Sequence, residues 1–189
     1  MDIDVLQIIE TLKSSDSATY AFDLVIERYS ERLYWHIRRI LVQHEQSQDA
    51  LQDTFVRAFL AVKGFRGATE AEFVSWLYKI ATTVALRELK RRRKHIFMSL
   101  DSLSNQLVSD FEGEIAPDAD DIAVRLQRAV VALPVKQKLV FNLRYYDELP
   151  FAEISKITGQ SVATLKTNYH YAVKRIKESV EELDYEQRE

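Results

Sequence analysis

The sequence predicts an all-α protein of two small helical domains, joined by a flexible acidic linker, and the second domain is a helix-turn-helix. Glycine and proline are scarce, with 4 and 3 residues among 189, whereas β-sandwiches and glycine-lined nucleotide sites use more turn residues. Apolar residues recur at helical spacing almost throughout, and no strand pattern of any length appears. We expect the first domain to span residues 1–96, the linker 97–121 and the second domain 122–189.

The first domain carries three apolar stripes whose members are three or four residues apart. They run over residues 22–41, 51–62 and 73–84. Each stripe predicts a helix with one buried face. Gly64 and Gly67 break the pattern between the second and third stripes, so we expect a loop there.

The linker and the second domain follow. Residues 99–117 contain Ser, Asp, Asn and Gly without a clean period, which indicates a linker about which the domains are mobile. Helical spacing returns at Ile122, and Pro134 ends that helix. Three more helical segments are expected at 135–146, 150–158 and 161 to about 182.

Charge is distributed in blocks, although the net charge is only −3. Residues 84–96 carry +5 and residues 159–177 carry +4, whereas residues 97–124 carry −7 and residues 178–189 carry −5. Two basic blocks on either side of an acidic stretch predict two surfaces that face a polyanion. Solvated helix faces are the alternative interpretation of each block taken alone.

Cysteine is absent, which excludes disulfides, thiolate metal sites and cysteine nucleophiles and suits a reducing compartment. The N-terminus MDIDVLQIIE has no basic-then-apolar signal pattern, and no apolar run approaches the roughly 20 residues of a membrane span. We therefore expect a cytoplasmic protein without membrane insertion.

The segment LPFAEISKITGQSVATLKTNYHYAVKRIK has the form of a helix-turn-helix. Gly159 stands where the turn needs a positive φ, and Ser161 is a good N-cap for the second helix. That helix hides Val162, Leu165, Tyr169, Val173 and Ile176 on one face. Its other face offers polar and basic residues, as a helix in the DNA major groove requires. An ordinary helical hairpin is the alternative.

The first domain sets aromatic residues beside a basic helix. Phe65, Phe73 and Trp76 flank the glycine-bounded loop, an arrangement that can hold single-stranded nucleic acid, although core packing is the favoured interpretation of Phe73. Upstream, Asp49 and Asp53 share one helix face. An enzyme site lacks its other parts here, so a basic protein partner fits this acidic pair better.

The motifs QDALQDTFVRAF, KGFRG, FVSWLYKIA and RELKRRRK resemble domain 2 of an extracytoplasmic-function sigma factor of RNA polymerase. The segment from ALPVKQKLVF to AVKRIKE resembles domain 4 of the same family. The resemblance covers about residues 18–94 and 132–180, in the order that two-domain sigma factors of this group have.

The resemblance implies three sets of binding residues. Core polymerase would be bound by Asp49, Gln52 and Asp53. The −10 DNA would be bound by Phe65, Arg66, Phe73, Trp76, Lys79, Thr83, Arg87, Lys90 and Arg91. The −35 DNA would be bound by Ser161, Thr164, Lys166, Thr167, Asn168, His170, Tyr171, Lys174 and Arg175. Thr83, Arg87, Asn168 and Tyr171 depart from residues common in the family, so we expect unusual promoter elements.

The resemblance also implies the function. The chain would bind the β′ coiled coil and the β flap of core RNA polymerase, read the −35 element as duplex and melt the −10 element of promoter DNA. An anti-sigma factor is a further expected partner. We expect no enzyme activity, no cofactor and no metal. A stand-alone helix-turn-helix transcriptional regulator is the main alternative, and a helical adaptor that binds only proteins is another.

Overall fold

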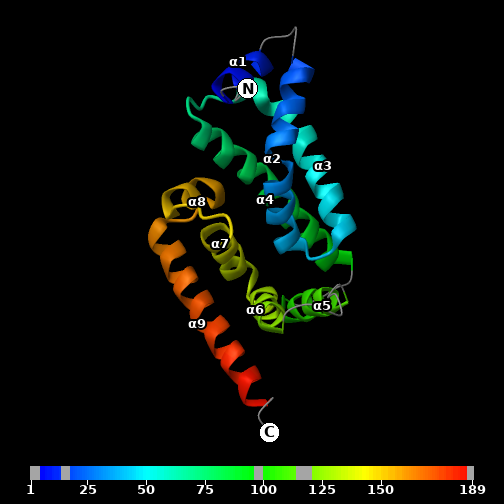
Figure 1. Ribbon diagram of the computed structural model, residues 1–189, viewed down its shortest axis with the longest axis vertical. Helices are drawn as coiled ribbons and strands as arrows, with labels where there is room; N and C mark the ends of the chain where they lie inside the picture. Colours follow the sequence, from blue (N-terminus) through cyan, green and yellow to red (C-terminus); the bar gives the residue numbers. More distant parts are fainter. Residues whose placement is uncertain (1–4, 14–17, 96–99, 114–120, 187–189) are drawn as a thin grey trace.

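The computed structural model describes residues 5–13, 18–95, 100–113 and 121–186, and all regular structure within them is helical (Figure 1). The all-α prediction is therefore confirmed for these residues. The N-terminal half contains α1 (Val5–Lys13), α2 (Ala18–Leu41), α3 (His44–Ala61), the 3-10 turn η1 (Val62–Gly64) and α4 (Glu70–His95). Further along lie α5 (Leu100–Glu112), α6 (Asp121–Ala132), α7 (Val135–Tyr145), α8 (Phe151–Thr158) and α9 (Val162–Glu186).

Helices α2, α3 and α4 form the core of the first domain, and α1 packs on α2 (Figure 1). The apolar stripes predict most of this packing, because most of their members are buried or partly buried, whereas Phe59 of the second stripe is 40% exposed. The largest fully buried side chains of these helices are Leu33, Ile37, Ile40, Leu41, Phe73, Leu77 and Tyr78. Burying a side chain of this size contributes about 1.5–3 kcal/mol. Between α2 and α3, Val42 adopts a φ of 72° while its side chain is buried, so the core holds a strained turn.

A helix occupies part of the segment that the sequence predicted to be an irregular linker. In α5, Leu107 is fully buried, and the Arg92 guanidinium at the end of α4 pairs with Asp110 at 2.8 Å. The prediction of an irregular segment was wrong here because Leu107, Val108 and Phe111 supply a short apolar face that packs against the core. Residues 96–99 and 114–120, also assigned to the linker or its edge, lie outside the described residues.

The second domain consists of α6 to α9. Pro134 and Pro150 occupy the N-cap positions of α7 and α8, where a missing N–H costs nothing. The inner face of α6 meets α7 and α9 in a cluster that contains Val130, Phe141 and Ala172. The three helices expected after Pro134 are all present, with boundaries within a few residues of the predicted ones. No described helix has the length and apolar character needed to traverse a bilayer.

The two domains contact each other directly. Helix α8 packs on α4 and α7 packs on α2, so segments distant in sequence lie side by side (Figure 1). One hydrophobic cluster runs from Leu33 and Leu77 of the first domain to Leu143 and Ile154 of the second. Mobility of the domains about the linker stays a prediction.

Candidate nucleic-acid and protein interfaces

The turn between α8 and α9 has the geometry that the sequence predicted. Gly159 ends α8 with a φ of 72°, in the left-handed region that glycine adopts without strain. Ser161 caps α9, because its Oγ accepts a hydrogen bond of 3.1 Å from the Thr164 N–H. The Ser155 hydroxyl donates to the Gln160 carbonyl at 2.7 Å and fixes the turn from the other side. The start of α9 is therefore rigidly placed.

The outer face of α9 is polar and exposed. Its exposed side chains are those of Ser161, Thr164, Lys166, Thr167, His170, Tyr171, Lys174 and Arg175. Asn168 is half-buried, and its Nδ2 donates to Gln160 Oε1 at 3.3 Å. On the inner face Leu165 and Ile176 are buried as predicted, and Tyr169 and Val173 are partly buried. The prediction that Val162 is hidden was wrong, because this side chain is 37% exposed. An exposed polar and basic face of this kind is what a helix in the major groove requires.

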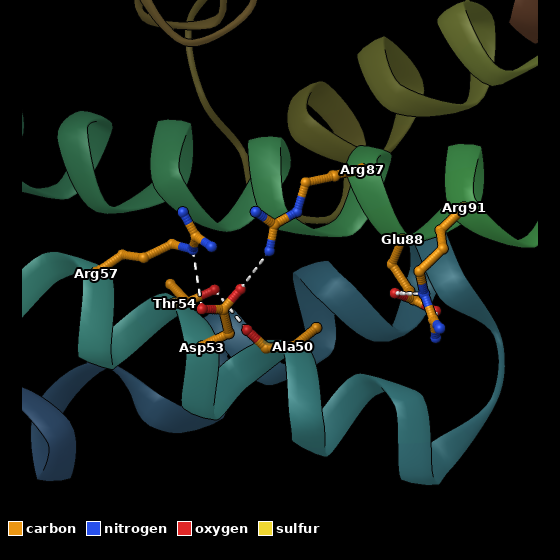
Figure 2. Close-up of polar contacts among 7 residues, drawn as sticks. All are labelled: Ala50, Asp53, Thr54, Arg57, Arg87, Glu88 and Arg91. Carbon is orange, nitrogen blue, oxygen red and sulfur yellow. Dashed lines mark hydrogen bonds and ion pairs between the residues drawn. The ribbon is translucent and has the colours of Figure 1, made fainter.

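Helix α3 presents the predicted acidic side chains. Asp49 and Gln52 are exposed, whereas Asp53 is only partly exposed. Both Asp53 carboxylate oxygens are engaged, one by Arg57 Nε at 2.9 Å and the other by Arg87 of α4 at 2.8 Å (Figure 2). The two guanidinium groups offset the repulsion between Asp49 and Asp53 that the sequence suggested. The polar surface of α3 is thus joined to α4 by the contact between Asp53 and Arg87.

Helix α4 presents an exposed polar row. Lys79, Thr83, Arg87, Lys90 and Arg91 all lie at exposed positions three or four residues apart. Arg91 donates from Nε and Nη2 to the two oxygens of the Glu88 carboxylate, at 2.8 and 2.6 Å (Figure 2). Of this row, Arg87 and Arg91 therefore already have acidic partners, and a polyanion must compete for them.

The aromatic residues next to this row pack on one another. The ring centroids of Phe65, Phe73 and Trp76 lie 5.3–5.6 Å apart, and Phe65 and Phe73 are 7% and 0% exposed. A Cβ placed on Gly67 would overlap the Phe65 ring, so this glycine permits a close approach of the loop. Arg66 beside them is exposed, and its guanidinium lies 3.4 Å from the Lys63 carbonyl. That Phe65, Phe73 and Trp76 bind DNA stays a prediction.

A capping box that the sequence analysis did not identify orders the loop before α4. The Glu72 N–H donates to Thr69 Oγ1, and Glu72 Oε2 accepts from the Ala68 N–H at 2.8 Å. The bond from Ala68 and the one from the Thr69 hydroxyl lower the pKa of Glu72. The signal was present as Thr69-x-x-Glu72, a common helix start.

Asp147, in the turn between α7 and α8, is the other site residue that sequence reasoning missed. It binds His36 and Arg39 of α2, which are 111 and 108 residues away in the chain. Burial opposes ionisation of Asp147, but the hydrogen bonds and charges of His36 and Arg39 outweigh it and lower the pKa. No local pattern signals a contact over this sequence distance.

Family models match both halves of the chain. The model described as Sigma-70 region 2 matches residues 25–95, and that described as Sigma-70, region 4 matches residues 123–176. The chain is 30% identical over 176 residues to RNA polymerase sigma factor YlaC of Bacillus subtilis, covering 88% of this chain and 95% of that protein. It is 24% identical over 193 residues to ECF RNA polymerase sigma factor SigW of the same organism, covering 97% and 100%.

Solved structures share the fold. The sigma factor RpoE of Bartonella quintana, in complex with the anti-sigma factor NepR, aligns with a TM-score of 0.65 at 17% identity over 85% of this chain and 96% of that chain. CnrH in complex with the cytosolic domain of CnrY aligns with a TM-score of 0.66 at 19% identity over 94% and 98%.

Proposed function

Because the chain belongs to the extracytoplasmic-function sigma factors of the sigma-70 family, we propose that it directs core RNA polymerase to promoters through the two surfaces described above. It is a transcription initiation factor. The observation that supports this use of the surfaces best is the pairing, in one chain, of an exposed polar row on α4 with an exposed recognition face on α9. We assign residues 1–96 to sigma domain 2, 97–121 to the linker and 122–189 to sigma domain 4.

Domain 4 reads the −35 element as duplex. The exposed residues near the start of α9, from Ser161 to Tyr171, face the base edges, whereas Lys174 and Arg175 lie further along and meet phosphates. The side chain of Asn168 is already tied to Gln160, so it contributes through this bond rather than as a free reader. The capped start of α9 sets the angle at which the helix enters the groove.

Domain 2 opens the −10 element. Lys79, Thr83 and Lys90 on α4 contact the strand backbone, and Arg87 and Arg91 join them when DNA displaces their carboxylate partners. A flipped base is received at the loop of residues 65–72, next to Trp76, which is partly exposed. Flipping a base costs a few kcal/mol, which these contacts and polymerase binding must offset. The chain carries out recognition and strand separation and performs no covalent chemistry, so we propose no enzyme activity.

Core polymerase binds through α3. Asp49 and Gln52 are exposed on this helix and are suited to basic and polar residues of the β′ coiled coil, while Asp53 completes the row. The β flap is the proposed partner of domain 4. The two solved structures that share this fold are complexes of a sigma factor with an anti-sigma factor and of CnrH with a cytosolic protein domain. An anti-sigma factor is therefore a further proposed partner. With these partners, the proposed location of the chain is the cytoplasm.

Co-elution with core RNA polymerase in gel filtration tests this proposal. The account predicts a stable complex with the purified full-length chain. A stand-alone helix-turn-helix regulator would bind duplex DNA but would elute apart from the polymerase. Such a regulator would also not require the exposed acidic face of α3, because it does not bind core polymerase.

A further inference from the structure

The side-chain amide of Asn168 on α9 is held from the turn that precedes the helix. Its Nδ2 donates a hydrogen bond of 3.3 Å to Oε1 of Gln160, which lies eight residues earlier in the chain. An asparagine amide has two N–H donors on Nδ2 and one acceptor atom, Oδ1. The bond to Gln160 therefore uses one N–H and leaves the other N–H and Oδ1 available to a ligand.

Gln160 is itself fixed through its main chain. The Gln160 N–H donates to Thr158 Oγ1 at 3.3 Å, and the Gln160 carbonyl accepts from the Ser155 hydroxyl at 2.7 Å. Gly159, directly before it, ends α8 with a φ of 72°. Because both main-chain groups of Gln160 are bonded to side chains of α8, the turn sets the point from which Oε1 holds Asn168.

Asn168 lies within the outer face of α9. Thr164, one turn earlier, and Tyr171, one turn later, are exposed, and Asn168 between them is partly exposed. The next residue, Tyr169, turns inward and stacks on Phe141 with ring centroids 6.0 Å apart. The remaining N–H and Oδ1 of Asn168 therefore belong to the face that is proposed to enter the major groove.

Each base presents its own pattern of donors and acceptors in the major groove. Adenine offers the N7 acceptor beside the N6 amino donor, and an asparagine amide binds both at once. Guanine offers two acceptors, cytosine one donor and thymine one acceptor, so none of them satisfies both groups of the amide. Because Gln160 holds Nδ2, the Asn168 amide cannot turn over and exchange its donor with its acceptor. An amide held in this way favours adenine.

We propose that Asn168 reads an adenine of the −35 element and that Gln160 is the residue that positions it. This inference rests on the proposed function, because only a helix α9 that reads duplex DNA brings a base to this amide. Gln160 lies in the turn and outside the predicted set of −35 residues. The hydrogen bond between the two side chains is the observation that gives it a role.

Binding of the holoenzyme to a complete set of single base-pair variants of the −35 element tests this inference. The holoenzyme contains the full-length chain and core polymerase. The parent chain should prefer adenine at one base pair on the order of tenfold over the other bases. Asn168→Ala should abolish this preference and leave the preferences at the other base pairs unchanged. Gln7→Ala, a change of an exposed amide in the first domain, is the control and should match the parent chain.

Two variants of Gln160 separate positioning from a general structural role. Gln160→Ala should weaken the adenine preference at the base pair that Asn168→Ala identifies, and at no other. Gln160→Glu retains an oxygen that accepts from Asn168 Nδ2, so it should keep the adenine preference, while its added negative charge lowers the affinity for all sequences alike. A residue that only stabilises the turn would change all base pairs equally in both variants, and that result would refute the positioning role.

Asn168→Asp tests the chemistry of the reading side chain. A carboxylate only accepts hydrogen bonds, and the cytosine amino group is the donor that it recognises. The preferred base at this position should therefore change from adenine to cytosine, which loss of folding cannot produce. Circular dichroism reports whether each variant is folded.

The possible failures are distinguishable. If the parent holoenzyme discriminates among −35 variants but folded Asn168→Ala has the same preferences at every base pair, this inference is refuted and the proposed function stands. If the parent holoenzyme ignores every −35 change, the proposed function fails and the inference fails with it. Nuclear magnetic resonance of the free full-length chain should show contacts between the Asn168 side-chain amide protons and Gln160. Their absence would refute the positioning role without any use of polymerase or DNA.

Discussion

At the scale of single residues, Lys138 is a fully buried titratable group of the second domain. Its side chain is 1% exposed, and its Nζ lies 3.4 Å from the Val131 carbonyl. Burial lowers its pKa from 10.5 to about 8. The neighbouring Asn142 is also fully buried, and its side-chain oxygen and nitrogen have no protein partner. These buried polar side chains therefore lower the free energy of unfolding, and the contribution of Lys138 depends on pH.

Stability should increase between about pH 8 and pH 10 because of Lys138. In this range the unfolded chain holds the lysine proton that the folded chain has released, so the free energy of unfolding rises with pH. The full effect is about 3 kcal/mol, since each pKa unit corresponds to 1.36 kcal/mol. Above pH 10 the raised pKa values of Tyr29 and Tyr78 act in the opposite direction, because these phenols stay protonated only in the folded chain.

Urea unfolding at pH 7.5, 8.5 and 9.5 measures this increase. Lys138→Met should abolish it, whereas Lys136→Met, an exposed change on the same helix, should retain it. An equal pH dependence in the parent chain and in Lys138→Met would contradict the assignment.

Gly67 is another residue whose identity the structure explains. Gly67→Ala should destabilise the first domain by about 1–3 kcal/mol, because the new methyl group must displace the Phe65 ring. Gly64→Ala is a matched control in the same loop, since nothing lies within 4 Å of its added Cβ. Chemical unfolding followed by tryptophan fluorescence, to which Trp76 beside Phe65 contributes, measures the difference. Equal midpoints for the two variants would show that the loop accommodates a side chain at either glycine.

At the scale of elements, the recognition helix α9 divides into a base-reading part and a phosphate-binding part. Lys166→Ala or Thr167→Ala should cost about 1–3 kcal/mol at particular base pairs and relax discrimination there. Lys174→Ala should weaken all sequences alike and lower the salt slope by roughly one. Its ion pair with Glu178 is long, at 3.7 Å, and leaves the ammonium available.

Holoenzyme binding to single-base variants of the −35 element, at two salt concentrations, separates these effects. If Lys174→Ala changed the preferred base while Lys166→Ala lowered affinity evenly, α9 would enter the groove in a different orientation.

The acidic face of α3 is the second element with a defined expectation. Asp49→Arg combined with Asp53→Arg should abolish assembly with core polymerase, because charge reversal replaces attraction with repulsion worth several kcal/mol. Asp53→Arg also removes the acidic partner of Arg57 and Arg87. The single variant Asp49→Arg avoids this side effect and should already weaken the complex. Glu45→Arg, an exposed change one turn earlier, is the control. A pull-down with unchanged affinity for the double variant would place the polymerase contact elsewhere.

The elements also show what the sequence could predict. Helices α2, α3, α4 and α9 were predictable because long apolar periods dominate their local signals, and Gly159 and Ser161 marked the turn by their own backbone preferences. Helix α5 was missed because its apolar face is short and lies among serines and aspartates. The contact of Asp147 with His36 could not be predicted, since it depends on how two finished domains pack.

At the scale of the whole molecule, the two basic blocks belong to separate domains that the folded chain brings together. The Asp110 carboxylate of α5 already neutralises Arg92 of the first block, and the contact between Asp147 and His36 joins the second domain to the first. We therefore expect the free chain to bind promoter duplex poorly, in line with its net charge of −3.

Run-off transcription with purified core polymerase tests the central claim most directly. Added full-length chain should produce defined transcripts from a genomic fragment library, and single base-pair changes in either promoter element should abolish them. Asp49→Arg with Asp53→Arg should give no transcript, whereas Glu45→Arg should match the parent chain. Transcription that does not depend on the added chain, or that ignores changes in both elements, would contradict the account.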